Sequence, residues 1–156
     1  MAGRIWRIDD ALKMIEEAKY NPFVRSVATQ VIRKRNIGHK DYLGQVRAIF
    51  DFVTERVRYV KDPFGYDQLS NPIRTIYEGV ADCEDSAILL ASLLQSVGFP
   101  TKLKLIATNG TTFDHIYVLA EVEMDDGVRW IPLDATLGRT KPIGYEVSYK
   151  RARIFE

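Results

Sequence analysis

The spacing of apolar residues divides the chain into a helical first part and a strand-like second part. Before residue 61, apolar side chains recur at intervals of three and four, which places them on one face of an α-helix. The clearest stripe consists of Leu43, Val46, Ile49, Phe50, Val53 and Val57. This pattern predicts a helix that starts at Asp41 and continues until Lys61–Gly65 breaks it.

Further helices are predicted on both sides of this stripe. Asp9 or Asp10 can cap a first helix that ends at Asn21-Pro22, and a second runs over about 23–35. After a long connection with a short helical turn at residues 73–77, another helix begins around Asp82-Cys83. That helix ends at Gly98, because the glycine is followed by Phe99-Pro100.

The second part of the chain alternates apolar and polar residues with the period of a β-strand. Lys102–Leu105 and 115–122 show this alternation, Asp126-Gly127 predicts a hairpin turn, and 128–133 returns as the next strand. Residues 145–155 could add another strand. Helices followed by an antiparallel sheet predict an α+β fold.

Composition restricts the function more than it defines it. The 156 residues suit a single domain, and a net charge of +1 argues against a nucleic-acid binder that relies on bulk charge. The N-terminus shows no secretory h-region, and the apolar run Ala87–Leu94 is too short to span a bilayer. We therefore expect no membrane partner, and a protein that is cytoplasmic or assembled into a particle such as a virion. The oligomeric state cannot be read from the sequence.

Metals and cofactors are not expected either. The single cysteine excludes an intramolecular disulfide. The chain has only two histidines, His39 and His115, and with the one cysteine they lack the spacing of zinc ligands. Asp125-Asp126-Gly127 is too short for a calcium loop and is better interpreted as a turn. We predict no metal site and no cofactor.

Cys83 is the candidate nucleophile. It falls in the first turn of a predicted helix, where unpaired backbone N–H groups and the helix dipole favour a thiolate. Its acidic neighbours Asp82, Glu84 and Asp85 oppose ionisation, so a nearby imidazolium is needed, and His115 is the best candidate. The alternative is that Cys83 is a small buried hydrophobic residue and that His115 is a satisfied core histidine.

Asp134 completes the order thiol, imidazole, carboxylate. It could accept a hydrogen bond from His115 and fix its tautomer, or it could simply cap the turn at the end of its strand. Strand register raises a difficulty. A tight turn centred on Asp126-Gly127 would place Leu119 opposite Asp134, so His115 would need a bulge or a longer loop to reach it.

Three blocks of sequence, in order and with compatible spacing, are similar to the transglutaminase-like superfamily, the circularly rearranged relatives of papain-type cysteine proteases. The similarity extends over about Asp41–Thr136, and it is closest to short bacterial and phage versions. The blocks are Phe52-Val53 with 57–63, Gly79–Leu90 with 98–100, and 115–122 with 130–136. The family often has glycine where this chain has Ala81, and residues before about 40 match nothing we can assign.

The resemblance implies a papain-like core, in which the nucleophile-bearing helix packs on the antiparallel sheet. It implies a catalytic triad of Cys83, His115 and Asp134 and acyl transfer through a thioester. Within one domain, 1–156, we expect a helical extension over 1–40, the core over 41–137 and a C-terminal strand or tail over 138–156. The Cys83 N–H is a natural oxyanion donor, Gln68 or Asn71 could add a side-chain donor, and Trp130 should pack against the site.

Several functions fit this machinery. Water is abundant and no feature specifies an amine acceptor, so the first expectation is a peptidase or amidase that acts on a protein or peptide. One alternative is a protein-glutamine transglutaminase that crosslinks its substrates. The other is a catalytically silent structural or assembly protein, possibly phage-associated, that retains the fold without the activity.

Overall fold

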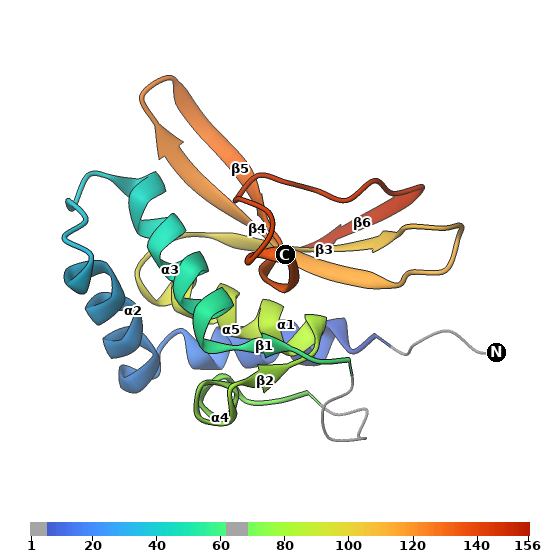
Figure 1. Cartoon of the computed structure of the whole chain (residues 1–156), viewed down its shortest axis with the longest axis horizontal. Coiled ribbons are helices and arrows are strands. Elements are labelled where there is room, and N and C mark those ends of the chain that lie inside the picture. The colour runs from blue at the N-terminus through green and yellow to red at the C-terminus, as the bar shows by residue number, and fades with distance from the viewer. Residues whose placement is uncertain (1–5, 62–68) are drawn as a thin grey trace.

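The computed structural model describes residues 6–61 and 69–156, and it contains helices and an antiparallel sheet as expected (Figure 1). The helices are α1 (Ile8–Ala18), α2 (Pro22–Lys34), α3 (Tyr42–Arg56), α4 (Pro72–Glu78) and α5 (Cys83–Ser96), with a short 3-10 helix η1 (Ala135–Leu137). The strands are β1 (Arg58–Tyr59), β2 (Val80–Ala81), β3 (Thr101–Ala107), β4 (His115–Met124), β5 (Gly127–Leu133) and β6 (Arg151–Phe155). The predicted α+β class is confirmed.

The main sheet has the order β5-β4-β3-β6, and all its neighbouring strands are antiparallel. Helix α5 is the centre of the molecule, since it packs on β3 and β4 and also contacts α1, α2, α3 and α4. Every residue of α5 from Cys83 to Leu94 is buried. The helices thus lie on one side of the sheet (Figure 1). The chain after β5 first contacts α3 and α5 through η1, and only its later part, around Val147, packs on the other side.

The alternation predicted for β4 separates two apolar clusters. Its even-numbered residues, from Ile116 to Val122, belong to the main core that α5 shares. On the other face, Ile106, Tyr117 and Leu119 form a second cluster, against which Val147 packs, and we call these four residues the outer cluster. His115 is the first residue of β4 and, two residues before Tyr117, has the same place in the alternation as Tyr117 and Leu119.

The hairpin between β4 and β5 turns one residue earlier than predicted. Met124 pairs with Gly127, so the turn consists of Asp125 and Asp126. Gly127 adopts a φ of +130°, a conformation open to glycine, at the first position of the returning strand. Because Val118 pairs with Leu133, the residue that faces Asp134 is Tyr117, and the expectation of Leu119 was wrong.

The third helix ends at Arg56, earlier than the apolar stripe indicated. Val57 is extended, and β1 pairs in parallel with β2, with the Arg58 N–H donating to the Gly79 carbonyl and the Val60 N–H to the Ala81 carbonyl. These strand hydrogen bonds outweigh the helical spacing of Val57, and they connect the chain that leaves α3 to the chain that enters α5. Ala81 adopts no positive φ, so alanine fits where the family often has glycine.

Candidate active site

Cys83 is the first residue of α5, as predicted. Asp82 caps the helix, its carboxylate accepting from the Asp85 N–H at 2.9 Å. Only 3% of the Cys83 surface is exposed, and the residue belongs to the main core. The thiol is therefore at the helix end that favours a negative charge, in a setting from which most water is excluded.

His115 and Asp134 meet directly. His115 Nε2 lies 2.7 Å from Asp134 Oδ2, and the two side chains are 16% and 3% exposed. No bulge is needed, because the pair is diagonal: His115 is two residues before Tyr117, which faces Asp134 in the register. The register argument against this pair is thereby removed.

Asp134 has two roles at once. Its Oδ1 accepts from the Thr136 N–H at 3.2 Å and from the Thr136 hydroxyl at 2.7 Å, which caps η1, while Oδ2 faces His115. The cap on η1 and the contact with His115, which the sequence presented as alternatives, occur together. A carboxylate held on one oxygen by a helix end has little freedom to turn away from the imidazole.

The charge state of His115 follows from its neighbours. Burial lowers the pKa of His115, but hydrogen bonds to Asp134 and Cys83, together with their charges, outweigh burial and raise it to about 10. The imidazole is therefore protonated at neutral pH. Since Nε2 is engaged by Asp134, Nδ1 is the nitrogen that remains for Cys83.

The acidic residues around Cys83 are buried, which changes their effect. Burial, assisted by Asp82 and Glu84 and opposed by the Ser70 N–H, raises the pKa of Asp85 to about 7. The Asp85 carboxyl accepts from that N–H at 2.7 Å, and Glu84 accepts from the Arg7 N–H at 3.3 Å. The expectation that all three acids oppose a thiolate therefore overstated the part of Asp85, whose carboxyl is about half protonated at neutral pH.

Two of the remaining predicted residues have contacts of their own. Asn71 caps α4 by accepting from the Ile73 N–H at 2.8 Å, and Gln68 lies outside the described residues. Trp130 is 38% exposed on β5, where the Lys102 ammonium lies 4.3 Å from its ring centroid. Their proposed oxyanion and cleft roles stay predictions.

Two contacts near Cys83 and His115 could not be predicted from the sequence. The Trp6 indole N–H donates to the Phe113 carbonyl at 3.2 Å, just ahead of β4, and Arg7 reaches the first turn of α5 through Glu84. Tyr117 falls within the strand predicted over 115–122, and nothing in the sequence marked it as part of the site. Its ring centroid lies 5.9 Å from that of His115, with an angle of 37° between the rings.

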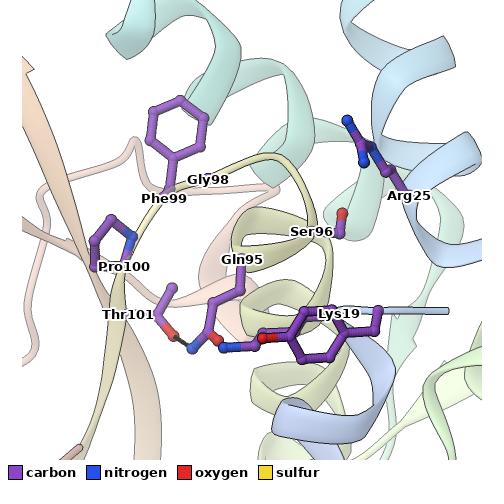
Figure 2. A pocket seen from close by; sticks show the side chains of 9 residues that line it. Lys19, Arg25, Gln95, Ser96, Gly98, Phe99, Pro100 and Thr101 are labelled. Carbon is purple, nitrogen blue, oxygen red and sulfur yellow. Dashed lines mark hydrogen bonds between the residues drawn. The ribbon is translucent and has the colours of Figure 1, made fainter.

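A hollow of about 530 Å³ lies at the other end of α5 from Cys83 (Figure 2). Figure 2 shows Lys19, Gln95 and Arg25 around it, with Gln95 donating to the Thr101 hydroxyl at 2.7 Å. It is shallow, and none of its lining residues belongs to the Cys83 site. Within the described ranges we find no cluster of histidine, cysteine and acidic side chains that could hold a metal, and no helix long and apolar enough to cross a bilayer.

Comparisons with known proteins bear on the family and the fold of this chain. A family model described as the transglutaminase-like superfamily matches residues 27–135. A comparison with curated protein sequences finds no significant match.

Solved structures share the fold at low sequence identity. A candidate cysteine protease from Cytophaga hutchinsonii is 16% identical with a TM-score of 0.55, and the match covers 84% of this chain and 50% of that one. A candidate protease from Parabacteroides distasonis is 11% identical with a TM-score of 0.52, over 77% of this chain and 25% of that one. Legionella pneumophila LapG is 21% identical with a TM-score of 0.50, over 86% and 75%. The chain thus spans half or less of the first two proteins.

Proposed function

Because the chain belongs to the transglutaminase-like superfamily, we propose that it is a cysteine-dependent enzyme that hydrolyses amide bonds of a protein or peptide. One observation carries the proposal. A buried imidazole, protonated at neutral pH, is held by Asp134 at 2.7 Å and hydrogen-bonded to Cys83. These three groups have the roles that nucleophilic catalysis requires: a nucleophile, its base and an orienting carboxylate.

In the proposed reaction, the Cys83 thiolate attacks the amide carbonyl carbon, and the carbonyl oxygen takes up the negative charge. The N–H groups of the first turn of α5, including that of Cys83, provide the positive end of the helix dipole for this oxyanion. His115 Nδ1 then donates its proton to the departing amine nitrogen, the C–N bond breaks, and a thioester with Cys83 remains.

The second half of the reaction releases the acid. The neutral imidazole takes a proton from a water molecule while the oxygen of that water attacks the thioester carbonyl carbon. The C–S bond then breaks, the acyl group leaves as a carboxylic acid, and the thiolate–imidazolium pair is restored. Asp134 keeps Nε2 engaged throughout, so Nδ1 alone exchanges protons.

Alkylation of Cys83 by iodoacetamide as a function of pH tests the ion pair. Because Cys83 is the only cysteine, the reaction reports one site. An ordinary thiol has a pKa of about 8.5. We expect alkylation of the native protein to persist well below this pH, and we expect His115→Ala to lose this low-pH reactivity. His39→Ala is the matched control, since that histidine is exposed in a turn.

A second measurement distinguishes hydrolysis from the other readings. Peptide substrates should yield free carboxyl termini with the native protein and none with Cys83→Ala. Incorporation of a primary amine into a glutamine-containing protein, without hydrolysis, would instead indicate a transglutaminase. An ordinary thiol titration, or no alkylation before unfolding, would contradict the proposal and favour a catalytically silent module.

A further inference from the structure

The segment from Gly144 to Lys150, just before β6, is fastened across the face of the sheet that the helices leave uncovered. The Gly144 N–H donates to the Pro132 carbonyl of β5 at 2.8 Å, and the Lys150 N–H donates to the Ala107 carbonyl of β3 at 2.8 Å. Between these points Val147 packs on the outer cluster. The segment therefore crosses β4 close to its beginning, which is where His115 lies.

A network of polar contacts attaches this segment to β3 and β4. Glu146 Oε2 accepts a hydrogen bond from the Tyr117 hydroxyl and pairs with the Lys104 ammonium. Lys104 and Tyr117 are direct cross-strand partners, and the Lys104 ammonium also lies 3.0 Å from the Tyr149 hydroxyl. Tyr117 is only 2% exposed, so the loss of its partner would leave a buried hydroxyl without its acceptor.

Tyr117 connects this network to the proposed site. Its ring lies 5.9 Å from the imidazole of His115, and its position in the register faces Asp134. Burial, then the hydrogen bond to Glu146 and the charges of Glu146 and Asp134, raises the pKa of Tyr117 above its ordinary value. The phenol therefore stays a neutral donor, and its orientation is determined by the acceptor on the C-terminal segment.

We propose that Tyr117, held in place by Glu146, is a positioning residue that fixes the plane of the His115 imidazole. The inference rests on the proposed function and extends the active site to the segment over 144–150. The hydrogen bond through Nε2 does not by itself fix the ring plane that the second hydrogen bond, to Cys83, requires. A neighbouring aromatic ring, anchored at its hydroxyl, restricts the tilt of the imidazole and keeps Nδ1 directed at Cys83.

Two substitutions at one position test this inference without changing the charge of the site. Tyr117→Phe retains the ring and loses its anchor, and Tyr117→Leu loses the ring. We expect the rate of Cys83 alkylation at pH 6 to fall roughly threefold in the first and on the order of tenfold in the second. Tyr149→Phe is the matched control, because it removes a hydroxyl from the same network without touching Tyr117, and its rate should match that of the native protein.

The titration of His115, followed by NMR, provides a readout that a purely structural role would not move. The groups that face His115 are Asp134, Cys83 and Tyr117. Tyr117→Leu leaves both charged neighbours in place, so a lower His115 pKa in this variant reports a poorer alignment with Asp134. Thermal unfolding identifies any variant that has lost its fold. If Tyr117→Leu has lost its fold, Tyr117→Phe, which preserves the packing volume, provides the test of the positioning role.

The outcomes separate this inference from the proposed function. Native-like alkylation and an unchanged His115 titration in folded Tyr117→Leu would overturn the positioning role. Equal losses in Tyr149→Phe would overturn it too, since they would reflect loosening of the whole segment. If the native thiol is unreactive, the proposed function fails, whereas a His115 titration that shifts in Tyr117→Leu would still support the positioning of the imidazole.

Discussion

Replacing Asp134 with asparagine removes the charge from the proposed triad with little change in shape. The Oδ1 cap on Thr136 is retained, because an amide oxygen also accepts hydrogen bonds. The atom that faces His115 Nε2 at 2.7 Å becomes either a neutral oxygen or an amide nitrogen. The substitution therefore tests the electrostatic role of Asp134 separately from its role in ending β5.

The size of the effect follows from the causes of the His115 pKa. Its value of about 10 is the result of burial, which lowers it, and of hydrogen bonds and charges from Asp134 and Cys83, which raise it. Asp134 contributes more than Cys83 in both respects. Without the charge of Asp134, burial still lowers the pKa of His115, and most of the interactions that raise this pKa are lost. We expect the pKa of His115 to fall, and each unit by which it falls corresponds to about 1.4 kcal/mol of lost stabilisation of the imidazolium.

The same linkage predicts how stability depends on pH. The folded-state pKa of His115 is raised above its ordinary value of 6.5. The stabilisation is therefore fully present below about pH 6.5 and is lost as pH rises through about 10. Native protein should lose up to about 5 kcal/mol over this interval from this group. Asp134→Asn should lose less, over a range that ends at lower pH.

Carbon-detected NMR of labelled histidine measures the His115 titration directly, with the His39 signal assigned through His39→Gln. Urea unfolding between pH 6 and 10 measures the stability. Asp126→Asn is the control, since that exposed acid pairs with Arg129 far from the site. A His115 pKa that falls further in Cys83→Ala than in Asp134→Asn, or that stays near 10 in both variants, would refute the reasoning.

Two further predictions concern the surroundings of the site. The pKa of Asp85 is raised from 3.8 to about 7, so the unfolded chain loses this proton at lower pH than the folded one, and the free energy of unfolding falls as pH rises from about 3.8 to about 7. Asp85→Asn should therefore stabilise the protein at pH 8 by roughly 2 kcal/mol or more and have less effect at pH 5, as measured by urea unfolding; lower stability at pH 8 would contradict this. A Cβ on Gly138 would lie 1.8 Å from Thr54 Cγ2, so Gly138→Ala should lower the unfolding free energy by about 2 kcal/mol or more. Gly110→Ala, with open space around it, serves as control, and equal melting temperatures would count against the clash.

The local part of the architecture was readable because side-chain periodicity reports local geometry. The apolar intervals of three and four predicted α1, α2, α3 and α5, and the alternation along 115–122 separated the two faces of β4 correctly. The end of α3 was misplaced. Arg58 and Tyr59 pair with a strand more than twenty positions away in the chain, and local periodicity carries no information about such a partner.

The register of the hairpin shows a second limit. Asp126-Gly127 is a sound turn signal, yet the turn residues are Asp125 and Asp126, and one residue of difference changed the position facing Asp134. This small shift removed the need for a bulge between His115 and Asp134. The sequence also could not indicate that burial would raise the pKa of Asp85, because desolvation depends on packing from several elements.

The sequence by itself determined the α+β class, the positions of the main elements and the candidate triad in its order, since residue type and local spacing carry that information. Only the tertiary structure decided that Asp134 both caps η1 and meets His115, and that Tyr117 is held by Glu146, 29 positions along the chain. Distances and pKa values arise from side chains that converge from distant segments, and no local pattern specifies that convergence.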